Sequence, residues 1–334
     1  MSVKIAINGF GRVGRLALRA AWGNPELEIV AINGRSGIVP YAHLLKYDSV
    51  HGTWPHEVTH DEEKIYVDGT PFLCLNKLDP AELPWRELGV DLVIEASGKF
   101  NDAKKAEAHL AAGAKKVILT APGKNEDATI VMGINEDEYD SSKHNIISNA
   151  SCTTNGLAPV VKVLHDAFGI KSGLMTTIHA YTNDQKIIDN AHKDLRRSRA
   201  AAMSLIPTTT GAARAIAKVL PVMEGKLNGF AVRVPTANVS MIDLTLDLEK
   251  EVTAETINQV LKAASEGAFK KYLGYCELPL VSVDFNGEKR SSVVDALSTM
   301  VVGGNLAKVV TWYDNEWGYS SRVVDLACFV ASQL

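Results

Sequence analysis

A glycine-rich loop directly after the first strand-like run constrains the fold more than any other feature of the sequence. The apolar run Val3–Asn8 leads into the pattern G-x-G-x-x-G, and a helical pattern follows over Arg12–Trp22. Between a strand and a helix, such glycines permit a tight turn and let the backbone approach a pyrophosphate, which the helix N-terminus attracts. We therefore predict a dinucleotide site, against the alternative of a surface turn that binds nothing. The motif glycines expected at the cofactor are Gly9, Gly11 and Gly14.

Short apolar runs and helical segments alternate through the first half of the chain. Helix-length segments such as Asp102–Ala112 separate several of the runs, a rhythm typical of βαβ units. Asp68-Gly69 predicts a hairpin turn inserted into this scheme. The fold class expected is α/β, with a doubly wound, Rossmann-type parallel sheet. Its strands are predicted over Val3–Asn8, Leu27–Ile32, Asp91–Ala96, Lys116–Thr120, Thr129–Gly133 and Asn145–Ser148.

The second half has a different character, with long β-rich runs that lie too close together for a crossover helix between each pair. A mixed or antiparallel sheet is therefore expected, in a second domain of the α+β type. The boundary between the domains is predicted near Ser148–Cys152, and helices over Val252–Gly267 and Glu316–Leu334. The strands expected here are Ser172–Tyr181, Leu227–Pro235, Val239–Leu248 and Leu306–Asp314.

Length, charge and cysteine usage narrow the class of protein. The 334 residues suit about two domains. With 35 Lys and Arg against 39 Asp and Glu, the net charge is −4, which argues against a nucleic-acid partner or an acidic membrane surface. The four cysteines form no C-x-x-C pair, so neither a metal site nor a disulfide framework is expected. No secretory signal or membrane-spanning run is evident, so the expected location is the cytoplasm.

The loop after the second strand bears on which dinucleotide is bound. A dinucleotide-binding unit selective for NAD carries an acidic residue about 20 positions after the glycine motif, which bonds the ribose 2′-hydroxyl. Here the loop holds Gly34, Arg35 and Ser36 and no carboxylate. A guanidinium and a hydroxyl suit a 2′-phosphate, so these three residues predict NADP, with NAD still possible. The alternative is a loop in which Arg35 points into water.

A single cysteine at the start of a helical pattern is the candidate nucleophile. Ser151 is a plausible N-cap, which places Cys152 in the first turn, where a helix N-terminus lowers a thiol pKa. Pro159 lies inside the helix, so its first turns are expected to be kinked or irregular. The candidate base is His179, which ends an apolar strand, although a histidine satisfied within the core fits that position equally well. Buried, inert thiols are expected at Cys74, Cys276 and Cys328.

Five long motifs, spread over the second half of the chain, resemble phosphorylating glyceraldehyde-3-phosphate dehydrogenase. The resemblance covers essentially the whole chain and implies a homotetramer of two-domain subunits, with the C-terminal helix packed back on the cofactor domain. It implies a dinucleotide-binding domain of residues 1–151 and 316–334, and a catalytic domain of residues 152–315. The motifs are Ser151-Cys152-Thr153-Thr154-Asn155, Thr176-Thr177-Ile178-His179-Ala180-Tyr181-Thr182, Pro207-Thr208-Thr209-Thr210-Gly211-Ala212-Ala213, Arg233-Val234-Pro235-Thr236 and Trp312-Tyr313-Asp314-Asn315-Glu316.

The resemblance also implies a mechanism and its residues. The Cys152 thiolate attacks the aldehyde of D-glyceraldehyde 3-phosphate, and His179 takes the hydroxyl proton of the thiohemiacetal as hydride leaves for the nicotinamide. Inorganic phosphate then attacks the thioester. The residues implied to hold the two anions are Ser151, Thr153, Thr182, Arg197, Thr210, Gly211 and Arg233. The further residues implied at the cofactor are Arg12, Val13, Lys77, Thr120 and Asn315.

The chain departs from the family pattern in three places. Gly34 replaces an acidic residue, and Asn190-Ala191 replaces a Leu-Pro pair in a loop expected to approach the ribose of a neighbouring subunit. Both changes make room for a 2′-phosphate and favour NADP. Gly156 stands where a second cysteine is usual, which argues against a redox role for a Cys-x-x-x-Cys pair.

Three other functions stay open from the sequence. One is an NAD-preferring glycolytic form. Another is erythrose-4-phosphate dehydrogenase, against which the intact Thr208-Thr209-Thr210-Gly211 segment argues, because it fits a site for attacking phosphate. The third is a Rossmann module without catalysis, which the complete set of Cys152, His179 and Asn315 makes improbable.

Overall fold

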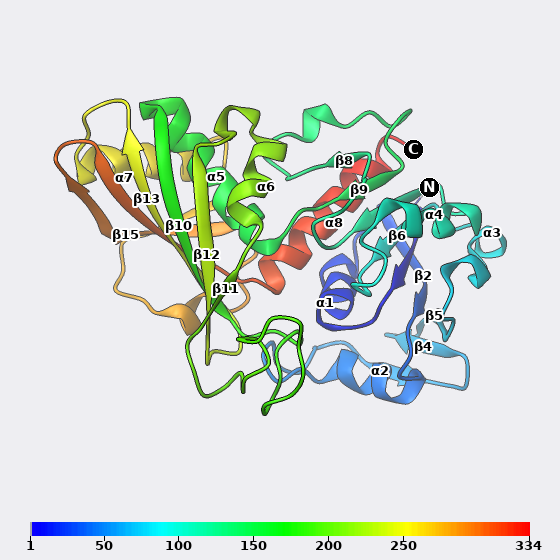
Figure 1. Cartoon of the computed structure of the whole chain (residues 1–334). Helices are drawn as coiled ribbons and strands as arrows, with labels where there is room; N and C mark the ends of the chain where they lie inside the picture. Colours follow the sequence, from blue (N-terminus) through cyan, green and yellow to red (C-terminus); the bar gives the residue numbers. More distant parts are fainter. Residues whose placement is uncertain (1) are drawn as a thin grey trace. The chain divides into compact units, whose positions relative to one another are not determined.

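A computed structural model describes residues 2–334 and divides the chain into two compact units. Unit 1 comprises Met1–Met132, Glu136–Ser151 and Ser320–Leu334. Unit 2 comprises Gly133–Asn135 and Cys152–Tyr319. Apart from Gly133–Asn135, the chain stays in unit 1 up to Ser151 and enters unit 2 at Cys152. It returns to unit 1 at Ser320, inside its last helix, α8 (Trp317–Ala331; Figure 1).

Unit 1 is built on a nine-stranded sheet whose central strands are all parallel. The strand order is β3-β4-β5-β2-β1-β6-β7-β9-β8. Ile5, Ile7, Leu92 and Ile94 are fully buried, as expected of strands covered on both faces. The strands are β1 (Val3–Asn8), β2 (Leu27–Asn33), β3 (Val58–His60), β4 (Lys64–Val67), β5 (Thr70–Leu75), β6 (Leu92–Glu95), β7 (Lys116–Leu119), β8 (Ala128–Thr129) and β9 (Ile146–Ser148). The helices are α1 (Arg12–Ala21), α2 (Ile38–Lys46), α3 (Trp85–Leu88) and α4 (Ala103–Ala111).

The predicted hairpin in unit 1 is confirmed, and one predicted strand is wrong. β4 and β5 pair antiparallel across Asp68 and Gly69, which both have positive φ (48° and 80°), as a tight hairpin turn requires. The strand expected over Thr129–Gly133 shrinks to β8, which has two residues. Its partner β9 ends at Ser148, so pairing stops after the Ile130 N–H bonds the Ser148 carbonyl at 2.9 Å.

Unit 2 is a mixed seven-stranded sheet in the order β11-β12-β10-β13-β16-β15-β14. β10 pairs parallel with β12 and antiparallel with β13, and the mixed sheet expected from the sequence is confirmed. Three helices lie against one face of this sheet in Figure 1, α5 (Cys152–Phe168), α6 (Ala212–Val219) and α7 (Ala254–Glu266). The strands are β10 (Ile170–Ala180), β11 (Ile206–Thr209), β12 (Leu227–Val234), β13 (Ser240–Leu248), β14 (Leu273–Cys276), β15 (Ser292–Val302) and β16 (Leu306–Tyr313).

The two faces of the unit 2 sheet differ in burial. β13 alternates strictly between buried and half-buried residues, and its buried set from Ser240 to Leu248 faces the helices. The opposite face exposes large apolar side chains instead. They include Leu174, Phe230, Leu297, Met300, Val302 and Leu306. Because β10 follows the same alternation, buried Met175, Thr177 and His179 share the helix-covered face.

Candidate active site

Cys152 is the first residue of α5, as the sequence predicts. The helix buries most of its length, and it continues unbroken through Pro159 to Phe168. Gly156, one turn after Cys152, packs closely, because a Cβ there would lie 3.3 Å from the Ser291 carbonyl oxygen and from the Tyr313 ring. A cysteine at this position would have to displace one of these neighbours.

His179 lies beside Cys152, at the end of β10. Its Nε2 atom is 3.5 Å from the Cys152 Sγ atom, a contact between residues 27 positions apart. His179 is 4% exposed, and its ring meets Tyr313 edge-on. The ring orientation is fixed from behind, since Nδ1 lies 2.6 Å from the Ala180 carbonyl oxygen. A thiol and an imidazole in this arrangement can exchange a proton.

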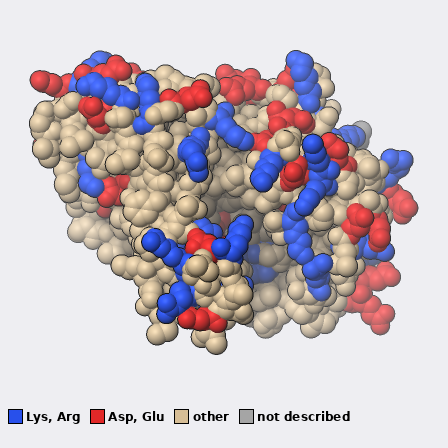
Figure 2. Space-filling view, viewed as in Figure 1, with Lys and Arg blue, Asp and Glu red and all other residues tan. Residues whose placement is uncertain are grey.

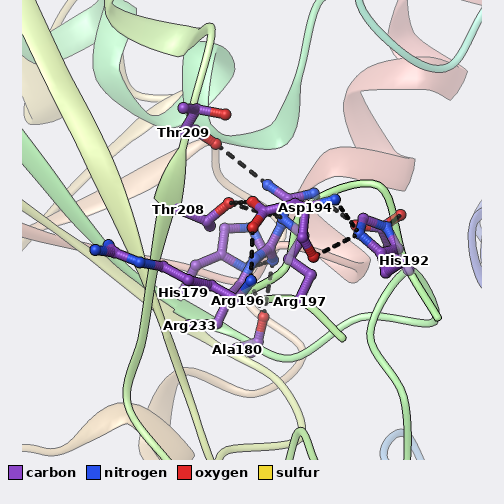
Figure 3. A network of polar contacts seen from close by, with 10 residues as sticks. His179, Ala180, His192, Asp194, Arg196, Arg197, Thr208, Thr209 and Arg233 are labelled. Atoms are coloured by element: carbon purple, nitrogen blue, oxygen red, sulfur yellow. Dashed lines mark hydrogen bonds and ion pairs between the residues drawn. The ribbon is translucent and has the colours of Figure 1, made fainter. Parts of the chain in front are cut away.

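Arg233 adjoins the other side of the imidazole ring. β10 and β12 run parallel with His179 in register with Arg233, so both side chains project on the same face. Arg233 Nη1 lies 2.5 Å from His179 Nδ1 and donates to the Ala180 carbonyl at 3.0 Å (Figure 3). A guanidinium is therefore placed on the opposite side of the ring from the Cys152 thiol.

The electrostatics of this trio differ from the expectation that the helix start lowers the Cys152 pKa. Burial raises the pKa of the Cys152 thiol, although the Arg233 charge opposes this shift. Burial, reinforced by the Arg233 charge, lowers the pKa of His179 to about 3. Both shifts favour a neutral thiol and a neutral imidazole in the free protein.

A second guanidinium, that of Arg197, is anchored near the same trio. Its Nη1 donates to Asp184 at 2.5 Å and its Nε to the Thr208 hydroxyl at 2.8 Å (Figure 3). Its Nη2 donates to the Thr209 carbonyl at 3.2 Å, which ties the side chain to β11. The Arg197 charge contributes to the lowered pKa of His179 and of Arg233. Two fixed guanidinium groups beside one imidazole form an arrangement suited to anions.

The remaining residues implied as anion ligands lie on two turns and at the start of α5. Gly211 precedes α6, where a side chain would meet no atom within 4 Å, and the Thr210 hydroxyl accepts from the Ala212 N–H at 3.2 Å. Thr182 follows the end of β10 by two residues, in the same loop as Asp184. Ser151 directly precedes α5, and the Thr153 hydroxyl lies 3.0 Å from the Tyr313 hydroxyl.

Asn315 is linked through the buried Ser240 hydroxyl to Ala180, the residue after His179. The Ala180 N–H donates to the Ser240 Oγ at 3.1 Å, and that hydroxyl donates to the Asn315 Oδ1 at 2.6 Å. No residue in the described part of the chain accepts from the Asn315 amide nitrogen. The amide is thus oriented with its N–H groups available to a carbonyl such as that of a carboxamide.

The glycine motif in unit 1 has the close packing that a dinucleotide loop needs. A Cβ on Gly9, where φ is 98°, would lie 2.3 Å from the Ser97 nitrogen, and one on Gly14 would lie 2.1 Å from the Gly9 oxygen. At Gly11, the residue before α1, a Cβ would meet nothing within 4 Å. The first turn of α1 has neither a side-chain cap nor an acidic residue. This geometry fits a pyrophosphate at the helix N-terminus.

The Arg12 side chain, which follows the glycine loop, forms an ion pair with Asp48. Its guanidinium forms a two-pronged pair with the buried carboxylate of Asp48, at 2.5 and 3.1 Å. The pKa of Asp48 falls to about 2, since hydrogen bonds from Arg12, His51 and Val50 outweigh the effect of burial. Arg12 and Val13 are the first two residues of α1, so their backbone N–H groups belong to its first turn.

The loop after β2 gathers the residues predicted to choose the cofactor. Gly34 donates its N–H to the Leu75 carbonyl at 3.1 Å, and Arg35 and Ser36 are exposed. Asn33 bonds both the backbone N–H and the carbonyl of Lys77, at 2.9 and 3.0 Å. Lys77 is thereby held beside the same loop. Asn190 and Ala191 are exposed in a separate loop, which belongs to unit 2.

A buried network at the carboxyl end of β6 carries no sequence motif. The Glu95 carboxylate, with no exposed surface, accepts from Asn8 at 2.5 Å, from the Ser97 N–H at 2.7 Å and from His109 at 3.1 Å. Trp85 donates to His109 Nδ1 at 3.0 Å, which leaves the ring proton on Nε2, facing Glu95. The sequence signal for this network is the position of Glu95, a carboxylate at the end of the apolar run of β6.

Thr120 is tied to the same strand end. Both its N–H and its hydroxyl donate to the Glu95 carbonyl at 3.0 Å. The carboxyl ends of β1, β6 and β7 are thus cross-linked next to the glycine loop, which is where open α/β sheets bind ligands.

A Rossmann-type unit joined to a mixed-sheet unit that carries a Cys–His pair is the architecture of a dinucleotide-dependent oxidoreductase. A family profile described as "Glyceraldehyde 3-phosphate dehydrogenase, NAD binding domain" matches residues 3–103, and one described as "Glyceraldehyde 3-phosphate dehydrogenase, C-terminal domain" matches residues 151–315. The chain belongs to the glyceraldehyde-3-phosphate dehydrogenase family. It is 59% identical to the glyceraldehyde-3-phosphate dehydrogenase of Geobacillus stearothermophilus, over all of this chain and 99% of that protein.

Other relatives extend this similarity across bacterial groups. The chain is 58% identical to glyceraldehyde-3-phosphate dehydrogenase 2 of Bacillus subtilis, over all of this chain and 98% of that protein. It is 54% identical to glyceraldehyde-3-phosphate dehydrogenase 2 of a Nostoc strain, over 99% of both proteins.

The surface, the cysteines and the helices add three observations. Basic and acidic side chains are interspersed over the face drawn in Figure 2. All four cysteines are free thiols, and burial raises the pKa of both Cys74 and Cys328 to about 11. Among residues 2–334 there is no helix with the length and apolar character needed to cross a bilayer.

Proposed function

We propose that this protein is a phosphorylating glyceraldehyde-3-phosphate dehydrogenase that prefers NADP or uses both NADP and NAD. It converts D-glyceraldehyde 3-phosphate and inorganic phosphate reversibly to 1,3-bisphosphoglycerate. The observation that carries this proposal is the 3.5 Å contact between Cys152 Sγ and His179 Nε2, with Arg233 against the same imidazole. The family match supports the substrate class.

In this proposal Cys152 is the nucleophile and His179 the proton carrier. His179 Nε2 takes the thiol proton as Sγ attacks the aldehyde carbon, which forms a thiohemiacetal. The Cys152 backbone N–H, at the helix start, stabilises the developing oxyanion. His179 returns the proton to that oxygen, which completes the thiohemiacetal, and takes it again as the carbon attached to Sγ is oxidised to a thioester. A nicotinamide dinucleotide would supply the hydride acceptor for this step, and the proton would then pass from His179 to solvent. Phosphate oxygen then attacks that carbon, and the Sγ–carbon bond breaks as the acyl phosphate leaves.

The two anions are assigned to the guanidinium groups near the base. Arg233 and Arg197 hold charge beside His179, and Arg197 is fastened to the strand that leads into Thr210 and Gly211. Thr182, Ser151 and Thr153 complete the two anion subsites. The Asn315 amide holds the carboxamide, because Ser240 already occupies its oxygen.

The cofactor preference rests on the loop after β2. Gly34 supplies no carboxylate, Arg35 makes no ion pair with any residue of the described chain, and Lys77 lies beside the loop. A group with a formal charge near −2 would find two cations and a hydroxyl there. Asn190 and Ala191 are assigned to the same site from a neighbouring subunit.

A homotetramer and a reducing compartment are parts of the proposal. The exposed apolar residues on the open sheet face, together with Ile187, Ile188, Leu195 and Met203, form the kind of surface that oligomers bury. The four free thiols support a location in the reducing cytoplasm. Residues 1–151 with 316–334 are assigned as the cofactor domain and residues 152–315 as the catalytic domain, close to the units observed.

The test separates an enzyme from a silent Rossmann module and from erythrose-4-phosphate dehydrogenase. Iodoacetate should inactivate the protein with one equivalent on Cys152, while Cys74 and Cys328 stay unmodified. Formation of reduced cofactor from glyceraldehyde 3-phosphate should require inorganic phosphate. Turnover that survives complete Cys152 modification, or that is faster with erythrose 4-phosphate, would overturn the assignment.

A further inference from the structure

Tyr41 of α2 folds back over the loop that is predicted to choose the cofactor. Its hydroxyl accepts the Ser36 backbone N–H at 3.1 Å. Its ring packs edge-on against Phe10 of the glycine motif, with centroids 5.3 Å apart, and the residue is 6% exposed. One buried side chain therefore contacts both loops that a dinucleotide would meet.

The same hydroxyl explains why position 34 is glycine in this chain. A Cβ on Gly34 would lie 2.0 Å from the Tyr41 oxygen and 2.7 Å from the ring carbon that carries it. Gly34 has an ordinary backbone conformation rather than a positive φ, so the contact with Tyr41 imposes glycine there. Tyr41 thus fills the space that a side chain at position 34 would otherwise occupy.

The Tyr41 hydroxyl retains an unused proton. It accepts from Ser36, and no residue of the described chain accepts the proton in return. A phenol is a neutral donor, whereas a carboxylate can only accept. At the place where an acidic residue would accept from a ribose hydroxyl, this chain offers a donor, close in sequence to the exposed Arg35. Asn33 holds the backbone of Lys77 beside the same loop.

We propose that Tyr41 is a specificity-determining residue, which shapes the Gly34–Ser36 loop and donates to the 2′-substituent of the adenosine ribose, favouring a phosphate over a hydroxyl. The inference rests on the proposed use of NADP and adds the residue that enforces it. Arg35 and Lys77 supply charge, and Tyr41 supplies both the loop shape and a fixed donor.

The first test measures binding of ligands that lack the nicotinamide. Calorimetry on the full chain gives dissociation constants for 2′,5′-ADP and for 5′-AMP, which differ by the 2′-phosphate. Tyr41→Phe should weaken 2′,5′-ADP about 10-fold or more, the range for a hydrogen bond to a charged group, and change 5′-AMP less than about 2-fold. Tyr47→Phe, at the exposed end of α2, is the matched control and should change neither.

The second test asks whether the Tyr41 side chain excludes a side chain at position 34. Gly34→Asp alone should weaken both ligands, because its Cβ collides with Tyr41 and displaces the loop. Gly34→Asp with Tyr41→Leu should restore 5′-AMP binding to within about 3-fold of wild type and leave 2′,5′-ADP weak. Equal effects of Gly34→Asp with and without Tyr41→Leu would overturn the steric role. Circular dichroism checks that each variant is folded.

The outcomes distinguish the two proposals. A wild-type chain that binds 2′,5′-ADP no tighter than 5′-AMP contradicts NADP use, and the double variant still decides the steric role of Tyr41. A wild-type chain that prefers 2′,5′-ADP, combined with an unchanged Tyr41→Phe variant, contradicts the donor role of Tyr41 alone.

Discussion

The Cys152–His179 pair in unit 2 and the Gly34–Ser36 loop in unit 1 differ in how their side chains are held. His179 is enclosed by Tyr313, the Ala180 carbonyl and Arg233, and its pKa is shifted by burial and charge. The loop instead presents Arg35 and Ser36 to solvent, and Tyr41 lies buried beneath it. The chemistry thus depends on groups removed from water, while cofactor choice depends on an exposed loop whose shape one buried ring sets.

The comparison predicts that substitutions in the pair are far more damaging than substitutions in the loop. The largest effect is expected for Cys152→Ser, because a hydroxyl ionises far less than a thiol. Turnover should fall by at least about 10⁴-fold, the scale of losing a nucleophile, while calorimetry shows unchanged cofactor binding. More than a tenth of wild-type activity in this variant would refute the role of Cys152.

His179→Asn should rank second. Removal of a general base costs roughly 10²–10⁴-fold in kcat/KM. The pH dependence of alkylation should change as well, since the thiol loses its proton acceptor 3.5 Å away. Identical pH profiles for iodoacetamide labelling of wild type and variant would show that His179 and Cys152 do not share a proton.

Arg35→Ala probes the exposed loop and should have a smaller, selective effect. Loss of one charge-assisted bond weakens binding roughly 10- to 100-fold. The kcat/KM for NADP should fall by that factor, with the value for NAD within about 2-fold of wild type. Arg86→Ala, at an exposed arginine of α3, serves as the matched control. If both cofactors respond equally to Arg35→Ala, the loop does not read the 2′-substituent.

The smallest effect concerns the charge next to the base. His179, with a pKa lowered to about 3, is neutral at neutral pH, and the raised pKa of Cys152 keeps the thiol protonated there. Alkylation of the free protein should therefore rise with pH from neutral to alkaline. An anion on Arg233 offsets its charge. That charge also stabilises the thiolate, but the guanidinium lies 2.5 Å from the imidazole, so the larger effect of the anion is to favour protonated His179 and with it the Cys152–His179 ion pair.

Sulfate at constant ionic strength should accordingly speed iodoacetamide labelling at pH 7 by a few-fold, whereas chloride should not. Arg233→Gln should lose this response. A sulfate response that persists in Arg233→Gln would show that the anion acts elsewhere.

The sequence predicts an element correctly where neighbouring residues alone determine it. The turn at Asp68 and Gly69, the glycine loop and the helix starting at Cys152 follow from residues adjacent in the chain. β8 was overestimated because its length depends on where β9 ends, which local apolarity does not reveal. β11, β14 and β15 were not predicted, since their pairing depends on partners far along the chain.

The site shows the same limit. Cys152 and His179 were chosen from local context, but the ring contact with Arg233 follows from the register between β10 and β12, 54 residues apart. Glu95, His109 and Tyr41 carry no motif, and their roles follow only from burial and contact. The expectation of a lowered Cys152 pKa failed because burial outweighs the favourable position at the helix start.

The most direct test of the account compares kcat/KM for NADP and for NAD, each with inorganic phosphate present and absent. We predict turnover of glyceraldehyde 3-phosphate that depends on phosphate with both cofactors and is about 10-fold or more faster with NADP, the lower end expected for one charge-assisted contact. Phosphate-independent turnover would contradict the acyl-transfer chemistry assigned to Cys152. Activity with NAD alone would contradict the reading of Gly34, Arg35 and Ser36.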